Sequence, residues 1–396
     1  MYQNFEESLQ ADHKSSAISR SEKIYEEGSM AKISLVKCEN YNSEKVFAAV
    51  KRSVDLLGGI EHFVRPGTKV LLKPNLLSAR VPEDAVDTHP EVVRAVVRLV
   101  RLAGAEPVIG DSPAGYGANI EDIFTKSGMR KVSEEEGVEL IKLTSSKVVD
   151  EIPISRQILD YDCVISIPKF KTHVITVLTG AIKNMYGSVV GMHKPHLHSL
   201  APKEKGFAKI VARIYSITRP ELTVVDSVVA MEGDGPSGGV PREMKFVMAG
   251  SDGVAIDSCL AKIVGLNPLD ILVTKEAYGM GAGEADLDLI EIAGDPLDDF
   301  IVKDFRLPQT TLLKFLPEVI VNGVATLLKF RPYINVSICA RCNLCKITCP
   351  VSCISIGKDR CTIDYKKCIR CMCCHEICPY KAIFIKRSIL TKLVWG

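Results

Sequence analysis

The chain has 396 residues, of which 46% are hydrophobic and 25% charged, a balance typical of globular proteins with two or three domains. Its net charge of +2 gives no reason to expect a nucleic-acid partner. No long uncharged apolar run predicts a transmembrane segment, and residues 1–29 lack the apolar core of a signal peptide. These features lead us to expect a cytoplasmic location.

The first 29 residues predict a weakly ordered extension, and Met30 is an alternative start of translation. From residue 30 onward, short apolar runs alternate with amphipathic helical patterns. Strands separated by helices are typical of a mainly parallel sheet covered on both faces, so we predict a Rossmann-like α/β domain over residues 30–296. Strands are expected at 32–36, 69–72, 107–110, 138–143, 163–167, 222–225, 246–249 and 289–293, and helices near 43–57, 90–103, 119–127, 174–185, 206–217, 253–264 and 269–279.

Residues 297–336 connect this domain to the end of the chain. Their strongly apolar stretch, 311–330, is interrupted by Lys314, Pro317 and Glu318. We interpret it as a helix packed on the sheet domain or between the subunits of an oligomer. A helix lying on a membrane surface is the alternative.

The last sixty residues contain one cysteine pattern twice. The runs Cys-x2-Cys-x2-Cys-x3-Cys-Pro begin at Cys339 and Cys368 and match the spacing of two-cluster bacterial ferredoxins, which residues 337–387 resemble. A single run also suits zinc, but two runs in register favour two [4Fe–4S] clusters in a small α+β domain over 337–396. Because the fourth cysteine of each run reaches the other cluster, the expected ligands are Cys339, Cys342, Cys345 and Cys378 for one cluster and Cys368, Cys371, Cys374 and Cys349 for the other.

Positive charge and cysteines beyond the eight expected ligands are also concentrated at this end of the chain. Residues 337–396 contain eleven Lys or Arg against three Asp or Glu, a formal +8, which leaves −6 for the remaining residues. These positive charges either offset the negative charge of bound clusters or form a docking surface for an acidic redox partner. Cys353, Cys361 and Cys373 exceed the number of ligands needed, and we interpret them as small buried apolar residues.

Several polar groups of the α/β domain follow predicted strands, at the edge where open α/β sheets bind ligands. Lysine suits a carboxylate or phosphate, and a histidine can pass a proton, so these groups predict a site for a small anion. Taken alone, each lysine could instead be a solvated surface residue, and each histidine could be a structural residue whose hydrogen bonds are made within the protein. The candidates are Lys73, His89, Lys169, Lys171, His173 and Lys183.

Three histidines, His193, His196 and His198, lie close together after Gly191. They could bind a metal, contact the substrate from a loop over the cleft, or simply be exposed.

Seven segments, KPN, DTHP, GDSPAG, KFKTH, GAIKNMYG, MEGDGP and SDGVAID, occur in this order between residues 73 and 257. Together they resemble the DUF362 family over 32–296, many of whose members carry a ferredoxin-type tail. The resemblance implies an iron–sulfur protein but supplies no established reaction. A looser likeness, in a strand–helix–strand unit whose helix begins at His-Pro, is to the nickel-pincer lactate racemases.

Three hypotheses follow from these observations. The leading one is an iron–sulfur electron-transfer protein in which two [4Fe–4S] clusters deliver electrons to a small anionic substrate in the α/β domain. The second is a dedicated electron carrier whose large domain only docks a partner. The third is a non-redox, racemase-like metal enzyme with structural or sensing clusters.

Overall fold

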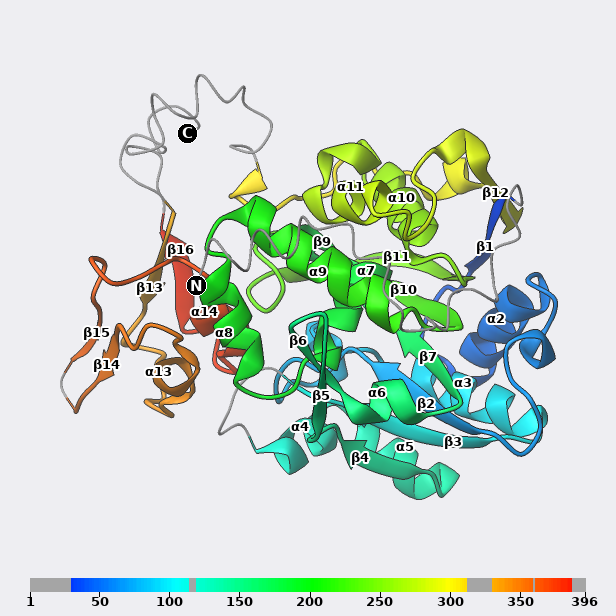
Figure 1. Cartoon of the computed structure of the whole chain (residues 1–396), viewed down its shortest axis with the longest axis horizontal. Helices are drawn as coiled ribbons and strands as arrows, with labels where there is room; N and C mark the ends of the chain where they lie inside the picture. The colour runs from blue at the N-terminus through cyan, green and yellow to red at the C-terminus, as the bar shows by residue number, and fades with distance from the viewer. Residues whose placement is uncertain (1–29, 114–118, 312–329, 359, 387–396) are drawn as a thin grey trace.

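A computed structural model describes residues 30–113, 119–311, 330–358 and 360–386 (Figure 1). The expectations for the N-terminal extension and for the apolar connector helix at 312–329 lie outside these residues. Within the described ranges, no helix has the length and apolar character needed to cross a bilayer.

The predicted mainly parallel sheet is confirmed. Its neighbouring strands follow the order β12-β1-β11-β10-β7-β2-β3-β4, with β8 paired to both β10 and β9. Only the pairs β1–β11, β10–β11 and β8–β9 are antiparallel. The strands are β1 (Ala31–Lys37), β2 (Lys69–Pro74), β3 (Glu106–Asp111), β4 (Glu139–Lys142), β7 (Cys163–Ile167), β8 (Lys169–His173), β9 (Val177–Thr179), β10 (Leu222–Glu232), β11 (Val240–Gly250) and β12 (Ile290–Gly294), with a separate hairpin of β5 (Ser146–Val149) and β6 (Ile152–Ser155).

Helices cover both faces of the sheet, so its central strands are buried on both sides and consist of continuous apolar runs. One face packs against α2 (Ser43–Asp55), α3 (Pro90–Leu102), α4 (Ile120–Lys126) and α5 (Met129–Glu136). The other packs against α6 (Arg156–Asp160), α7 (Ala181–Asn184), α8 (His193–Leu200), α9 (Glu204–Thr218), α10 (Gly253–Ile263) and α11 (Leu272–Gly279).

The helix expected near 174–185 is largely wrong. Residues 169–173 form β8, which pairs with β10, and β9 follows before the short helix α7 begins at Ala181. Val, Ile and Thr make up most of residues 174–179, and β-branched residues favour strands when a sheet edge is available to pair with. β9 pairs with β8, and β8 in turn pairs with β10, which lies far along the chain.

A small α+β unit follows at one end of the molecule (Figure 1). Its two short sheets pair β13 with β16 and β14 with β15, both antiparallel. The elements are β13 (Arg331–Ile334), α13 (Leu344–Thr348), β14 (Ile354–Ile356), β15 (Cys361–Ile363), α14 (Cys373–Ile377) and β16 (Ile383–Lys386).

The 29-residue cysteine repeat is also a repeat of backbone conformation. Non-glycine residues with positive φ occur at equivalent positions of the two halves, at a cost of roughly 1–2 kcal/mol each. The pairs are Arg341 and Arg370 (φ 55° and 60°), Asn343 and Met372 (65° and 56°), and Ser352 and Lys381 (48° and 51°). Strained backbone of this kind clusters at functional sites. Its repetition in both cysteine loops indicates that function, rather than stability, determines their conformation.

Helix α14 joins the small unit to the large one. The Ser237 hydroxyl donates to the backbone oxygen of Glu376 at 2.6 Å, and Nε2 of His375 lies 3.1 Å from the backbone oxygen of Asp234. Lys381 adds an ion pair with Asp84 at 3.0 Å.

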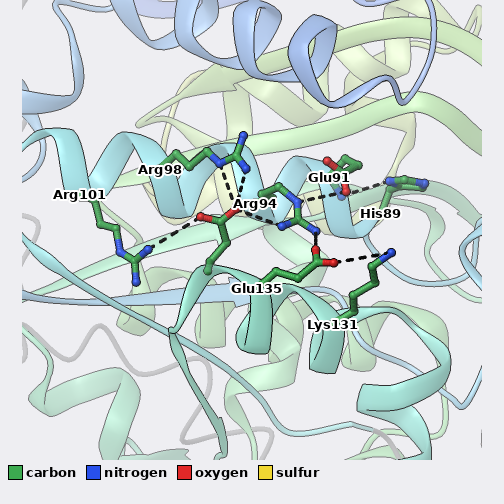
Figure 2. A network of polar contacts seen from close by, with 8 residues as sticks. His89, Glu91, Arg94, Arg98, Arg101, Lys131 and Glu135 are labelled. Carbon is green, nitrogen blue, oxygen red and sulfur yellow. Dashed lines mark hydrogen bonds and ion pairs between the residues drawn. The ribbon is translucent and has the colours of Figure 1, made fainter.

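Helices α3 and α5 are held together by an ion-pair network (Figure 2). Arg94 has only 8% of its side chain exposed, and its guanidinium meets Glu91 at 3.1 Å, Glu135 at 2.6 Å and Glu136 at 3.0 Å. Arg98 also reaches Glu136, at 2.7 Å, but is 44% exposed.

We predict that Arg94→Met lowers the free energy of unfolding by about 2 kcal/mol, because it leaves three carboxylates facing a partly buried gap. The matched exposed variant, Arg98→Met, should cost less than about 1 kcal/mol. Urea unfolding of the two proteins, prepared without air, measures the difference. Equal losses would contradict this account of the network.

Candidate functional site

A cavity lies where the carboxyl ends of β2, β3 and β8 meet the small unit. The chain runs outward from β2 to β3 and β4 and then returns to β7 on the other side of β2. Such a reversal leaves a crevice at the carboxyl ends of the strands, where open α/β sheets bind ligands. Charged and polar groups of the lining are Lys73, Asn75, Asp111, Ser112, Lys171, His173, Thr179, Lys183, Asn184, Tyr186, Lys194, His198, Thr348, Cys373 and Glu376.

Lys73 is fully buried at the end of β2. Its Nζ forms an ion pair with Oδ1 of Asp111 at 3.0 Å and donates to Oδ1 of Asn184 at 3.3 Å. A Cβ on Gly187 would lie 2.5 Å from that Nζ, so only glycine allows the close approach. Asp111 ends the neighbouring strand, so this pair joins two parallel strands at the cavity floor.

The short helix α7 brings Lys183 and Asn184 to the cavity because Asp257 caps it. The Asp257 carboxylate accepts from the backbone N–H of Ala181 at 2.6 Å and of Ile182 at 3.2 Å, and burial raises its pKa to about 7. Nζ of Lys183 lies 4.4 Å from the centre of the Tyr186 ring, a cation–π contact. Burial lowers the pKa of Lys183.

Two further lysines line the cavity, Lys171 from β8 and Lys194 from α8. Nζ of Lys171 donates to the backbone oxygen of Val86 at 2.5 Å, and both Lys171 and Asp87 are buried. Burial lowers the pKa of Lys171 and raises that of Asp87. Lys194 of α8 donates to the backbone oxygen of Ser112, and burial lowers its pKa to about 7.

His173 and Glu376 face each other across the junction of the two units. Nδ1 of His173 accepts from the N–H of Ile175 at 3.1 Å, which leaves Nε2 as the protonated nitrogen, 3.3 Å from Oε1 of Glu376. That approach is not aligned as a hydrogen bond, and both atoms are buried without another partner in the described chain. Burial lowers the pKa of His173 to about 4, whereas His173 and Lys183, against the effect of burial, hold the pKa of Glu376 at about 2. The histidine is therefore neutral and the carboxylate ionised at pH 7.

The structure thus brings together Lys73, Lys171, His173 and Lys183, but not His89 or Lys169. The ring of His89 stacks on Tyr41 at 3.5 Å. Its Nδ1 accepts from the N–H of Glu91, as a cap of α3 (Figure 2). Nζ of Lys169 is buried against Asp226 at 2.9 Å. Both belong to a separate polar cluster, and His89 owes its position to the preference of a polar side chain for the start of a helix.

The histidine-rich segment forms helix α8. His193 and His196 are exposed, whereas His198 is buried, stacks on Phe207 at 4.0 Å and lines the cavity. In the described chain no three His, Cys, Asp or Glu side chains are placed to hold a metal ion. The position of His198 therefore agrees with the expectation of a segment beside the cleft. His193 and His196 agree with the expectation of simple exposure.

Sequence reasoning missed several cavity residues. Lys194 lies between His193 and His196, and the histidines alone were considered as site residues. Glu376 and Cys373 lie within the second cysteine motif, which was interpreted only as a cluster-binding sequence. The sequence did indicate Asp111, because the polar start of the GDSPAG segment comes directly after an apolar run.

Cysteines of both motifs pack in one cluster of the small unit. Cys339, Cys342, Cys345 and Cys378 line one small cavity. Burial, and then the charges of Cys378, Cys342 and Cys339, raise the pKa of the Cys345 thiol to about 12.

Cys374 is buried in the same cluster. Burial, and then the charges of Cys371, Cys345, Cys368 and Cys349, raise the pKa of the Cys374 thiol well above its usual range. Backbone N–H groups donate to sulfur at equivalent places of the repeat, from Cys353 to Cys349 at 3.4 Å and from Ala382 to Cys378 at 3.3 Å.

This cysteine-rich unit is compatible with a bound metal ion or iron–sulfur cluster. Crowded thiols with raised pKa become thiolates only when a positive centre compensates them. N–H donors to sulfur are the contacts that tune such clusters.

Because His198 is buried in its neutral form, we predict that the folded protein loses stability at acidic pH. Burial lowers the pKa of His198 to about 3, so its contribution to stability is complete above the unfolded pKa of about 6.5 and is lost as the pH falls toward the folded value. His198→Phe should therefore lose about 1 kcal/mol less stability than the wild type between about pH 7.5 and pH 5.5. Thermal unfolding at the two values tests this, and identical losses would contradict it.

Comparisons with known proteins agree with the motif order. Residues 70–262 match the family model described as a domain of unknown function, DUF362. The thylakoid-associated protein sll1697 of Synechocystis is 31% identical over 292 residues, which cover 71% of this chain and 88% of that protein. The lactate racemase apoprotein of Thermoanaerobacterium thermosaccharolyticum aligns with a TM-score of 0.34 and 9% identity over 57% of this chain and 55% of the racemase, too low to support an argument. The chain belongs to the DUF362 family.

Proposed function

We propose that the protein is an iron–sulfur oxidoreductase of a reducing compartment, with two [4Fe–4S] clusters in the small unit and a small anionic substrate in the lysine-lined cavity. Bound clusters would supply one-electron transfer. The observation that carries the proposal is the position of α14, whose five residues include the proposed ligand Cys374 and the cavity residues Cys373 and Glu376.

The first support is the agreement between spacing and geometry in the small unit. Spacing assigns Cys378 to the first set, and Cys378 lines one small cavity together with Cys339, Cys342 and Cys345. The second support is the charge of the cavity, where four lysines converge and can bind an anion through charge-assisted hydrogen bonds.

The exposure of the cysteines also suggests the order in which electrons would pass through the two proposed clusters. Cys342 of the first set is exposed, whereas Cys374 of the second is buried next to the cavity. The first set therefore suits exchange with an external partner, and the formal +8 of residues 337–396 favours an acidic one. The second set suits delivery to the substrate.

Iron content tests the cluster assignment. Protein prepared without air should contain about eight iron atoms per chain, and Cys349→Ser should lose or convert one cluster. The matched variant Cys361→Ser, which changes a surplus cysteine, should keep about eight. About four or fewer iron atoms in the reconstituted wild type would contradict two clusters, and stoichiometric nickel or zinc would favour the metal-enzyme alternative.

A second experiment separates an oxidoreductase from a simple carrier. Reduced wild-type protein should be reoxidised by a suitable small anion without any partner protein, and Lys183→Met should slow this about tenfold or more while the visible spectrum of the clusters is unchanged. A carrier would be oxidised only by its partner, and at the same rate in both proteins.

A further inference from the structure

We propose that the anionic substrate of the cavity carries a hydroxyl group, which His173 and Glu376 bind together at the junction of the two units. This inference rests on the proposed function only in placing a small anion in the cavity. It adds a recognition element that the lysines do not supply, because an ammonium group binds a carboxylate or phosphate whatever else the molecule carries.

His173 presents a fixed hydrogen-bond donor to the cavity. Its side chain is 2% exposed and lines the cavity. Nδ1 accepts from the backbone N–H of Ile175 at 3.1 Å and of Thr176 at 3.3 Å, so this nitrogen carries no proton. Nε2 therefore carries the hydrogen, and it has no hydrogen-bond partner among the residues that the structure describes. A buried donor of this kind needs an acceptor from a ligand or water.

Glu376 presents the matching group from the small unit. Its Oε1 lies 3.3 Å from Nε2 of His173 and is likewise buried without a hydrogen bond in the described chain. An oxygen atom about 2.8 Å from both atoms would complete a triangle on this edge, so one ligand atom can reach the pair. A hydroxyl oxygen can accept from His173 while it donates to a carboxylate, and it can also accept from a protonated carboxyl group. A hydroxyl group therefore fits whichever protonation state Glu376 has.

The remaining polar groups of the lining also favour a hydroxylated ligand over an alkyl one. Three further buried atoms of cavity residues make no hydrogen bond within the described ranges, namely Oδ1 of Asn75, Oγ1 of Thr179 and Oγ1 of Thr348. An alkyl group would leave these atoms unpaired, whereas hydroxyl groups can both donate to them and accept from them. Thr348 belongs to α13, so α13 and α14 of the small unit both contribute to the same cavity.

The anionic end of the ligand has a separate partner in Lys183. The other three lysines of the lining each have a partner, which is an aspartate in one case and a backbone oxygen in the other two. Nζ of Lys183 lies 4.4 and 5.6 Å from the ring centres of Tyr186 and Phe207, and has no hydrogen bond or ion pair to any other residue that the structure describes. The anion and the hydroxyl group are therefore recognised by different side chains, which can be altered one at a time.

Calorimetric titration of the full, oxidised, cluster-loaded chain tests the proposal with anions that differ by one hydroxyl group. Glycolate and acetate form a carboxylate pair, and 2-hydroxyethyl phosphate and ethyl phosphate form a phosphate pair, so the two sources of negative charge are distinguished. We expect the hydroxylated member of at least one pair to bind about tenfold or more tightly than its partner.

Equal affinities within both pairs would show that water takes the place of the hydroxyl group and would overturn the proposal, while the anion site of the proposed function would stand. The absence of saturable binding of all four probes would contradict both. Because no electron is transferred, neither result depends on the redox activity.

Two variants of His173 form a matched pair. The amide of asparagine can replace Nδ1 as the acceptor for Ile175 and Thr176 but is too short to reach the position of Nε2, whereas the longer glutamine can place its NH2 group there. We expect His173→Asn to bring the affinities of the hydroxylated and unhydroxylated anions to within about twofold of each other, and His173→Gln to restore part of the difference. An unchanged difference in His173→Asn would refute the role of this residue.

Lys183→Met separates recognition of the anion from recognition of the hydroxyl group. It should weaken both members of a pair by about tenfold or more and leave their ratio unchanged. Lys205→Met, on the exposed surface of α9, should bind all probes as the wild type does. Loss of the ratio in Lys183→Met, with His173 intact, would contradict the division of roles. Visible absorbance before each titration detects cluster loss or misfolding.

Discussion

The proposed activity depends on the contact between helix α14 and the carboxyl edge of the large sheet. Nε2 of His173 lies 3.3 Å from Oε1 of Glu376, and the Ser237 hydroxyl holds the backbone of the same glutamate at 2.6 Å. A helix of five residues therefore contains both the proposed cluster ligand Cys374 and the cavity residues Cys373 and Glu376. If this contact were absent, the cysteine sites and the lysines would belong to two unrelated structures.

Burial gives the cavity its chemistry. Lysines in water are simply solvated, but here each one is desolvated and must be compensated by a carboxylate, a backbone oxygen or a bound anion. The fold supplies most of these partners through strand ends and a capped helix, as with Asp111 beside Lys73 and Asp257 at the start of α7. The sites left without partners are the places where a ligand contributes most.

Local patterns in the sequence predicted the sheet and most of its helices, because these depend on periodicity. The division of eight cysteines into two sets follows from their spacing and stays a prediction. Local patterns also indicated four of the residues that line the cavity. They could not exclude His89, whose DTHP segment serves a helix start, nor find Lys194 and Glu376, which reach the cavity only through packing between distant segments. The helix expected near 174–185 was wrong for a similar reason, because Val177–Thr179 forms β9, which pairs with β8, and β8 pairs with the distant strand β10.

Anomalous diffraction at the iron edge, from crystals grown without oxygen, tests the central claim most directly. The account predicts two compact groups of iron, one within Cys339, Cys342, Cys345 and Cys378, and the other within Cys368, Cys371, Cys374 and Cys349, with α14 still docked on the large sheet. Single zinc ions in the cysteine motifs, or iron groups in a small unit detached from the lysine-lined cavity, would contradict it.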